Sequence, residues 1–357
     1  MKNNRQILYL ISNMYPSKTN IRYGVFVKNF KNSVNKKYRV KKIVLPKKYR
    51  LLDKIIGYIY LYFKIFRLLF TASSRNPIYV HAPLFMAPVL SLFCWSNKKL
   101  FLNFHGNDML FDSFKKKILA RFQICLVKKY PVIVPSSYFA RKISDYYQKN
   151  IDEILVYPSG GIDTSVFYPD NTLRENNFTI SFVSSFVSEK GWSVFLDAIA
   201  RLVRQKTISD LKVIMVGDGP DKSLIQKQIK DLSLPVQLFS GLTHSQIARI
   251  YRQSDIFVFP TQYKGESLGL VGLEAMACGT PVIGSKHPAL LTYLKDGENG
   301  LVFDVNKKTD LYLKILKYNN LSDDKKHRLR QAALQTAARY DSKKVQMELL
   351  NFLAKNQ

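Results

Sequence analysis

The feature that most constrains the fold is a repeated alternation of short apolar runs with helix-like segments. In the first half of the chain the apolar runs are QILYLIS, RVKKIVLP, PIYVHAP, KLFLNFHG and YPVIVPSS. The second half repeats the pattern in FTISFVSS, LKVIMVGDG, PVQLFSG, DIFVFPT and TPVIGSK. Strands that alternate with helices of about 10–15 residues form parallel sheets, because parallel neighbours need a crossover connection. The sequence therefore predicts an α/β protein with two Rossmann-like, doubly wound parallel-sheet domains.

A domain boundary is expected near residue 165. The segment VYPSGGIDTSVFYPDNTLRENN is rich in Gly, Pro, Asn and Asp, which is typical of a connection. We expect an N-terminal domain over residues 1–165 and a C-terminal domain over 166–335. Residues 336–357 should form a last amphipathic helix that packs back toward the N-terminal domain. Ligands of open parallel sheets bind beyond the carboxyl ends of the strands, so two such domains facing a cleft would carry their function in the loops there.

The net charge of +29 is distributed unevenly along the 357 residues. Residues 1–165 contain 29 Lys/Arg and 7 Asp/Glu, whereas the remainder contains 26 and 19. A charge that served only solubility would not segregate by domain, so the basic half indicates an anionic partner. The basic segments contain no nucleic-acid reader motif and no interleaved stacking platform. We therefore expect an anionic membrane surface as the partner, and no nucleic acid.

A basic segment is followed directly by a long apolar one. Residues 36–54 contain nine Lys/Arg and one acid, and residues 51–70 read LLDKIIGYIYLYFKIFRLLF. The second segment is predicted to be a helix that is apolar almost all round, with a narrow face of Lys54, Gly57, Lys64 and Arg67. Its charges and the soluble strands around it disfavour a membrane span. Part of it should pack on the first sheet, and the remaining apolar face predicts a peripheral anchor on the membrane.

The cysteines and histidines predict neither a disulfide framework nor a metal site. Cys94, Cys125 and Cys278 lack paired spacing, which favours a reducing compartment. His81, His244 and His287 are interpreted as structural, since none has metal-ligand spacing. The apolar run of residues 7–11 is too short for a signal peptide. A cytoplasmic, metal-independent protein without a cofactor is therefore expected.

Two carboxylates stand eight residues apart in GESLGLVGLEAMACGTPVIG, at Glu266 and Glu274. The stretch predicts a helix over residues 268–277, with Gly279 at its C-terminus. Eight residues cover about 12 Å of helix rise. The free N–H groups and the positive dipole at the start of this helix suit a phosphate. The expected phosphate ligands are the backbone groups of Ser267, Leu268, Gly269 and Leu270.

A nucleotide sugar matches this layout. Its diphosphate would rest on the helix N-terminus, its ribose hydroxyls would reach Glu274, and its sugar hydroxyls would reach Glu266. The alternative is structural, with one acid capping the helix and the other buried in a salt bridge. The spacing alone does not separate the two interpretations.

The whole stretch resembles the E-x7-E signature of the retaining nucleotide-sugar glycosyltransferases of family four, which have the GT-B fold. Six further segments resemble motifs of that family, in the expected order: MYPSKTNIRYGVFV, FHGND, YPSGGIDTSVFYP, EKGW, VIMVGDGP and DGENGLVF. The resemblance covers nearly the whole chain. It implies a retaining transfer of a hexosyl group from a nucleotide-sugar donor to a glycan acceptor. Together with the expected membrane anchor, it predicts a lipid-linked acceptor in surface-polysaccharide biosynthesis.

The resemblance also implies roles for individual residues. Glu274 would bind the ribose, and Glu266 would bind the donor sugar near the reaction centre. Lys190 would neutralise the leaving diphosphate, which a metal ion does in other enzymes. Gly24 would let the opening loop approach the diphosphate, and His105 would lie beside the donor sugar.

The sequence departs from the family pattern before Lys190, where Ser185 stands in place of the usual arginine. Lys264 is a candidate substitute. Asp108 has two interpretations, a site residue or a cap of the helix that begins DSFKKKILARF. Two alternative functions stay open: a nucleotide-sugar epimerase or hydrolase of the same fold, and a membrane-docked, catalytically weak partner of another transferase.

Overall fold

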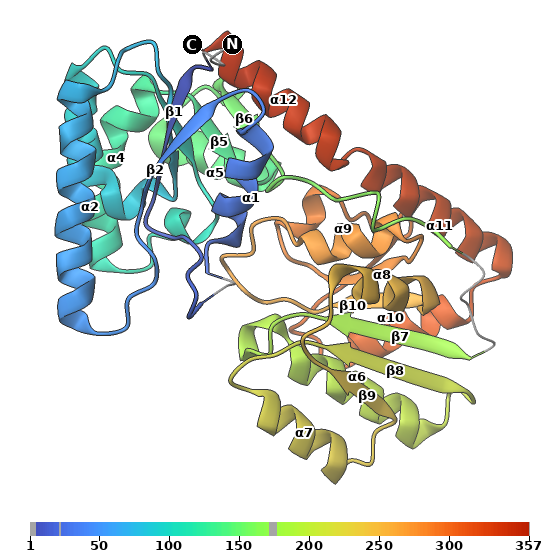
Figure 1. The fold of residues 1–357 in the computed structure, drawn as a ribbon. Helices are drawn as coiled ribbons and strands as arrows, with labels where there is room; N and C mark the ends of the chain where they lie inside the picture. Colours follow the sequence, from blue (N-terminus) through green and yellow to red (C-terminus); the bar gives the residue numbers. More distant parts are fainter. Residues whose placement is uncertain (1–4, 21–22, 171–176, 357) are drawn as a thin grey trace. The chain divides into compact units, whose positions relative to one another are not determined.

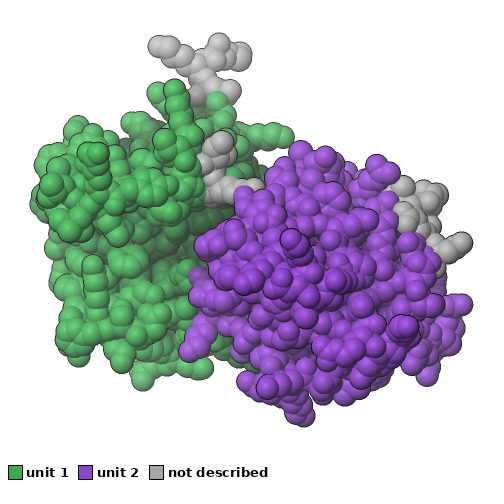
Figure 2. Space-filling model, turned by 90° about the horizontal axis from the view of Figure 1, so that it is seen from below, with its two compact units in different colours: residues 1–160, 345–357 green, residues 161–344 purple. Residues whose placement is uncertain are grey.

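The structure is a computed structural model that describes residues 5–20, 23–170 and 177–356 (Figure 1). Contacts divide the chain into two compact units (Figure 2). Unit 1 consists of Met1–Gly160 and Val345–Gln357, and unit 2 of Gly161–Lys344. Each unit is built on its own parallel sheet.

Unit 1 contains a six-stranded parallel sheet of order β2-β1-β3-β4-β5-β6. Its strands are β1 (Ile7–Ser12), β2 (Arg39–Val44), β3 (Ile78–His81), β4 (Leu100–Asn103), β5 (Val132–Val134) and β6 (Ile154–Val156). The strand order reverses between β1 and β3, whose register pairs Leu10 with Tyr79. Loops that leave the carboxyl ends of strands on either side of such a reversal diverge, which leaves room for a ligand.

Helices cover both faces of this sheet (Figure 1). One face packs against α2 (Leu51–Thr71), α3 (Ala87–Leu90), α4 (Phe114–Lys129) and α5 (Ser137–Tyr147). The other face packs against α1 (Val25–Val34) and α12 (Ser342–Lys355). The last helix therefore belongs to the core of unit 1, where Val345, Leu349 and Leu353 recur every four residues along one helical face and are buried.

Unit 2 repeats the architecture with the strand order β12-β11-β10-β7-β8-β9. Its strands are β7 (Phe178–Val183), β8 (Leu211–Val216), β9 (Val236–Phe239), β10 (Ile256–Phe259), β11 (Val282–Ser285) and β12 (Gly300–Phe303). The order reverses between β7 and β10, which pair in parallel through Ile256 and Ile180. The carboxyl ends of these two strands are therefore the expected ligand edge of unit 2.

The helices of unit 2 also lie on both faces of its sheet. One face packs against α6 (Trp192–Gln205), α7 (Lys222–Asp231) and α10 (Asp310–Asn319). The other packs against α8 (His244–Gln253) and α9 (Leu270–Ala277). The helix α11 (Asp323–Ala338) contributes to both clusters through Leu329 on one side and Ala333 on the other.

The prediction of an α/β chain with two parallel sheets is confirmed, and all ten expected strands are present. The sequence interpretation missed β6 and β12. The strand β6 has only three residues, and β12 begins with a glycine inside a segment that was interpreted as a motif. Short strands like these carry little periodic signal.

The prediction that the cysteines are unpaired is wrong for two of them. Cys94, near the end of the turn before β4, and Cys125, in α4, have Cα atoms 6.2 Å apart and form a disulfide. The two residues are 31 positions apart in the sequence and are brought together by the packing of α4 against the segment before β4. Sequence spacing does not encode that packing. Cys278 is free and buried.

The helix α2 forms as predicted and leaves a broad apolar surface exposed. Its buried residues are Leu61, Ile65 and Leu68, a single narrow stripe. Phe63 is 61% exposed, and Leu51, Leu52, Ile55, Ile56, Ile59, Tyr60, Phe66 and Phe70 are exposed as well. We call these nine residues the apolar face of α2. Among the helices of the described residues, none combines the length and the apolar character that crossing a membrane requires.

Candidate functional site

Two loops at the switch point of unit 2 bring Lys190 and Glu266 together. Lys190 ends a short turn after β7, and Glu266 lies in the loop between β10 and α9. The Lys190 Nζ is 2.6 Å from the Glu266 Oε2, and the Thr261 hydroxyl donates to the same oxygen at 3.1 Å. Glu266 is only 8% exposed. A buried carboxylate needs such partners, because burial of an unpaired charge is costly.

Backbone contacts fix the relative position of the two loops. The Gln262 N–H donates to the Glu189 carbonyl at 2.7 Å. Gly191 has φ +74°, and a Cβ there would lie 2.0 Å from the Pro260 carbonyl oxygen. Only glycine permits this approach, so the EKG sequence holds Lys190 against the loop that carries Glu266.

His287, which the sequence interpretation treated as structural, lies near the Lys190–Glu266 pair. Burial lowers its pKa, and the Glu266 carboxylate acts in the opposite direction, so the imidazole lies within electrostatic reach of that group. It follows β11, the strand next to β10 in the sheet. Its position just beyond the carboxyl end of a strand beside the switch point is the sequence signal that places it at this edge of the sheet.

The helix α9 begins two residues later than predicted. It spans Leu270–Ala277, with Gly269 as its N-cap at φ +79°. Ser267 and Leu268 therefore belong to the preceding loop, not to the first turn. Glu266 and Glu274 are not on one helix, so the helix rise does not describe their separation. Gly269 is required here, because a Cβ would lie 2.5 Å from the Phe259 ring.

Glu274 lies inside α9 and has no ion pair. Burial raises its pKa to about 7. Within residues 5–20, 23–170 and 177–356, its carboxylate has neither a hydrogen-bond nor a salt-bridge partner. The structural alternative expected one acid as a helix cap and the other buried in a salt bridge. Glu266 does form a buried salt bridge, with Lys190, but neither glutamate caps α9, whose N-cap is Gly269. A half-buried carboxylate without a partner is a candidate for binding a ligand.

In unit 1, His105 pairs with His81. The His105 Nε2 is 2.8 Å from the His81 Nδ1, and the two rings stack with centroids 5.0 Å apart. Burial lowers the pKa of His105 to about 3, so the ring is neutral. The interpretation of His81 as purely structural is incomplete, because its ring orients His105. The two residues end or follow the neighbouring strands β3 and β4.

Asp108 does not cap α4. Its Oδ1 accepts the His105 backbone N–H at 2.8 Å, and Ser113 provides the N-cap of α4. Asp108 is 4% exposed, its Oδ2 has no partner among the described residues, and burial raises its pKa to about 7. The carboxylate thus holds the turn that follows β4.

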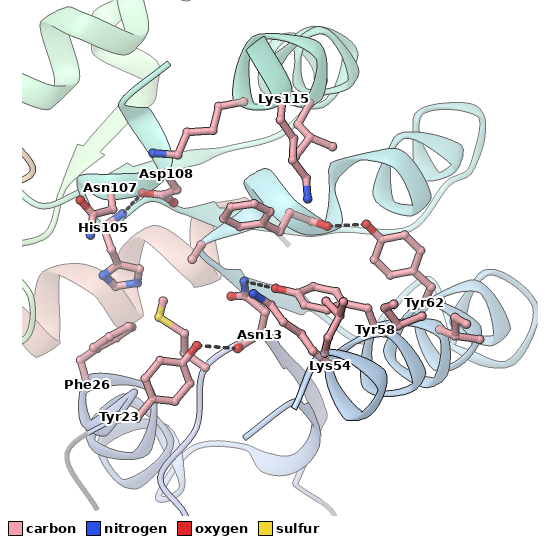
Figure 3. Close-up of a pocket in the computed structure, with 18 residues that line it drawn as sticks. Asn13, Tyr23, Phe26, Lys54, Tyr58, Tyr62, His105, Asn107, Asp108 and Lys115 are labelled. Atoms are coloured by element: carbon pink, nitrogen blue, oxygen red, sulfur yellow. Dashed lines mark hydrogen bonds between the residues drawn. The ribbon is translucent and has the colours of Figure 1, made fainter. Parts of the chain in front are cut away.

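A pocket of about 920 Å³ lies in unit 1 beside these residues (Figure 3). His105, Asn107 and Asp108 form one end, and the loop after β1 contributes Asn13 and Met14. The helices α2 and α4 form its other walls. Phe26, from α1, packs against His105 with the ring centroids 4.2 Å apart and the ring planes tilted by 41°.

Gly24 is the N-cap of α1 at φ +71°. A Cβ there would lie 2.6 Å from the carbonyl carbon of Met14, so the segment before α1 folds closely against the end of β1. Ser185 and Lys264 are both exposed, in the loops after β7 and β10. The role suggested for Lys264 stays a prediction. Among the described residues, no group of three or more His, Cys, Asp or Glu is arranged to hold a metal ion.

Part of unit 2 matches a known family. Residues 166–336, slightly less than half of the chain, match the profile of the glycosyl transferases group 1 family. This matched segment is therefore similar to members of that family. It contains Lys190, Glu266, Glu274 and α9, so the residues described for unit 2 all lie within the matched segment.

Several known proteins are similar to this chain. An uncharacterized glycosyltransferase of Methanocaldococcus jannaschii is 28% identical over 222 residues, which are 61% of this chain and 58% of that protein. A D-inositol 3-phosphate glycosyltransferase of Paenarthrobacter aurescens is 30% identical over 183 residues, which are 48% of this chain and 44% of that protein. The chain thus spans about half the length of the curated relatives it matches.

The fold has solved counterparts. The crystal structure of Anabaena HepE in complex with UDP and glucose has a TM-score of 0.73 and 17% identity, and the match covers 98% of this chain and 100% of that one. At this identity the likeness shows the fold alone. The predicted GT-B fold class is confirmed.

Proposed function

We propose that the chain is a retaining glycosyltransferase that moves a hexosyl group from a nucleotide sugar to a hydroxyl group of its acceptor. The observation that carries the proposal is the ion pair of Lys190 and Glu266. It lies at the switch point of the unit 2 sheet, within the segment that matches the glycosyl transferases group 1 family. Ligands of open parallel sheets bind at such points.

The residues of unit 2 suit the parts of a donor. The diphosphate would bind at the N-terminus of α9, at Gly269 and Leu270, where backbone N–H groups and the helix dipole favour an anion. Lys190 would contact the same diphosphate and stabilise the negative charge that grows on it as the glycosidic bond breaks. With a fixed cation in that place, we propose a reaction that needs no metal ion or other cofactor.

The two glutamates would bind hydroxyl groups. Glu266, held by Lys190 and Thr261, can accept hydrogen bonds from the donor sugar. Glu274 has a half-buried carboxylate without a partner among the described residues, which suits the ribose hydroxyls. His105 is proposed beside the donor sugar as a neutral imidazole. The solved HepE complexes with UDP and glucose support a UDP-hexose as the first donor to test.

The acceptor is proposed to be a lipid-linked glycan of surface-polysaccharide synthesis, reached from the cytoplasmic face of the membrane. The support is the apolar face of α2 and the basic residues that precede it, Lys47, Lys48 and Arg50, all exposed. A cation near an anionic bilayer surface contributes about 1 kcal/mol to binding, so the cluster could hold unit 1 at the membrane without insertion. Aromatic and aliphatic side chains beside basic ones are typical of interfacial helices.

A donor screen tests the proposed function. Binding and slow hydrolysis of UDP-, GDP- and dTDP-hexoses would be measured for the wild-type chain, with and without a chelator. We expect one base to be preferred, and we expect hydrolysis to persist with the chelator and to fall in Lys190→Ala. Failure to bind every nucleotide sugar would contradict the proposal. Release of free sugar as fast as any transfer would favour a hydrolase.

A further inference from the structure

Two residues that line the pocket of unit 1, Asn13 and Asp108, each hold a buried hydrogen-bond acceptor that lacks a donor among the described residues. Asn13 is 7% exposed, and its Nδ2 donates to the Tyr58 hydroxyl at 3.1 Å, while its Oδ1 has no partner. The Oδ2 of Asp108 is likewise without a partner; both statements hold for the described residues. Buried polar atoms are nearly always paired in folded proteins, so two unpaired acceptors lining one cavity indicate a ligand with hydroxyl groups.

Two lysines also line the same pocket. Lys54 from α2 and Lys115 from α4 both line it, and Figure 3 shows the two side chains reaching into it from those helices. Neither ammonium has a carboxylate partner among the described residues, whereas the neighbouring Lys116 pairs with Asp112 at 2.9 Å. Two unpaired ammonium groups on facing helices suit a phosphate or diphosphate.

The pocket is continuous with the apolar face of α2. Leu51, Ile55 and Ile59 recur every four residues and lie on one side of that helix. They line the pocket, and they are also among the exposed residues of the apolar face. A hydrocarbon chain that starts at the two lysines would therefore pass along these three residues to the surface that we propose faces the membrane.

We propose that this pocket binds the phosphate end of a lipid-linked acceptor. Its sugar hydroxyls donate to Asn13 and Asp108, its phosphates lie between Lys54 and Lys115, and its hydrocarbon chain lies along Leu51, Ile55 and Ile59. The inference rests on the proposed function, because it assigns the acceptor of that reaction to one cavity. The chemical class it names is a sugar phosphate on a polyprenyl-type chain.

Binding of model compounds tests the proposed sites for the phosphate groups and for the hydrocarbon chain. Isothermal titration would use geranyl diphosphate, inorganic diphosphate and geraniol, each with the full-length chain and without a nucleotide sugar. We expect geranyl diphosphate to bind about tenfold or more tighter than either fragment. The double variant Lys54→Ser, Lys115→Ser should lose about 10- to 100-fold in affinity for it. The matched control is Lys36→Ser with Lys117→Ser, which removes the same charge from exposed lysines outside the pocket and should stay within about twofold of the wild type.

A second variant separates this pocket from the donor site, where a diphosphate also binds in our account. Lys190→Ala should leave geranyl diphosphate binding unchanged. Equal affinity for geranyl and inorganic diphosphate would overturn the inference, since the pocket would then recognise a free phosphate alone. An equal loss of affinity for geranyl diphosphate in the pocket variant and in its matched control would also overturn the inference.

The proposed contacts of the sugar hydroxyl groups with Asn13 and Asp108 have a separate test. Glucose 1-phosphate should bind more tightly than inorganic phosphate, and Asp108→Asn should remove that difference while the circular dichroism spectrum stays native. Equal affinity of the wild-type chain for glucose 1-phosphate and inorganic phosphate would overturn the proposal that the sugar hydroxyl groups bind in this pocket. These titrations need no donor, so a failed donor screen and a failed pocket are distinguishable results.

Discussion

The Lys190 ammonium lies 2.6 Å from the Glu266 carboxylate and joins the loop after β7 to the loop after β10. The two side chains come from opposite sides of the strand-order reversal in unit 2. Each side chain thus compensates the charge of the other, which would be costly to bury without a partner. A ligand that brings a diphosphate would give Lys190 a second anion while Glu266 keeps its bond from Thr261.

Lys190→Ala should lower turnover much more than donor affinity. The charge on the leaving diphosphate grows toward the transition state, so a cation placed there lowers the barrier more than it tightens ground-state binding. We expect kcat to fall by about 10²–10³ while the donor Kd changes by less than about tenfold. Lys222→Ala is the control, since it removes a partly exposed lysine whose Nζ lies 3.9 Å from the Asp218 Oδ1. Equal losses in kcat and Kd would mean that Lys190 only binds.

Glu274 should make the folded state less stable as the pH rises toward neutrality. Burial raises its folded-state pKa from the usual 4.5 to about 7, so the folded chain binds more protons than the unfolded chain between these values. The free energy of unfolding therefore falls as the pH rises through that window. Glu274→Gln cannot ionise and should show a smaller fall in urea unfolding between about pH 5 and pH 7.5. The same slope in both proteins would show that Glu274 does not titrate there.

The membrane proposal predicts a charge-selective interaction with vesicles. The purified chain should sediment with vesicles that contain anionic lipid, should be released by high salt, and should ignore neutral vesicles. Replacing Lys47, Lys48, Arg50 and Lys54 by serine should reduce sedimentation and spare nucleotide binding.

The matched control for the vesicle experiment replaces four exposed lysines of unit 2 by serine: Lys227, Lys230, Lys307 and Lys325. It removes the same total charge without touching the segment before α2, and should sediment like the wild type. Sedimentation with neutral and anionic vesicles alike, or with neither, would contradict the proposal.

The stereochemistry of the product is a further prediction. The anomeric configuration of the transferred sugar should match that of the donor, in the presence of a chelator as well as without it. NMR of the product measures the configuration through the coupling constant of the anomeric proton. An inverted product, or a strict requirement for Mg²⁺ or Mn²⁺, would contradict the proposed reaction.

Ten of the twelve strands that the structure describes could be predicted, because each of the ten is a compact apolar run that ends in a turn residue. The start of α9 could not, since GESLGLVG contains glycines that fit either a loop or a helix. Gly269 adopts a left-handed conformation, so the helix begins only at Leu270. The Phe259 ring leaves no space for a side chain at position 269. Such packing is not visible in a local pattern.

The candidate site was predictable to the extent that its residues follow strands. Lys190, Glu266 and His105 each lie just beyond one, and the structure pairs the first two directly. The partners of the site residues were harder to predict. The contact of His81 with His105 depends on β3 and β4 being neighbours, and the disulfide of Cys94 and Cys125 depends on where α4 packs.

The central claim is that α9, with Glu274 inside it and Glu266 in the loop before it, forms the donor site of a nucleotide sugar. The most direct measurement is calorimetric titration of the preferred nucleoside diphosphate into the wild-type chain, Glu274→Ala and Glu266→Ala. Loss of a charge-assisted hydrogen bond to the ribose should weaken binding about 10- to 100-fold in Glu274→Ala. Glu266→Ala should bind the diphosphate nearly as well as the wild type and abolish transfer. Unchanged binding in Glu274→Ala would remove that residue from the site and contradict the account.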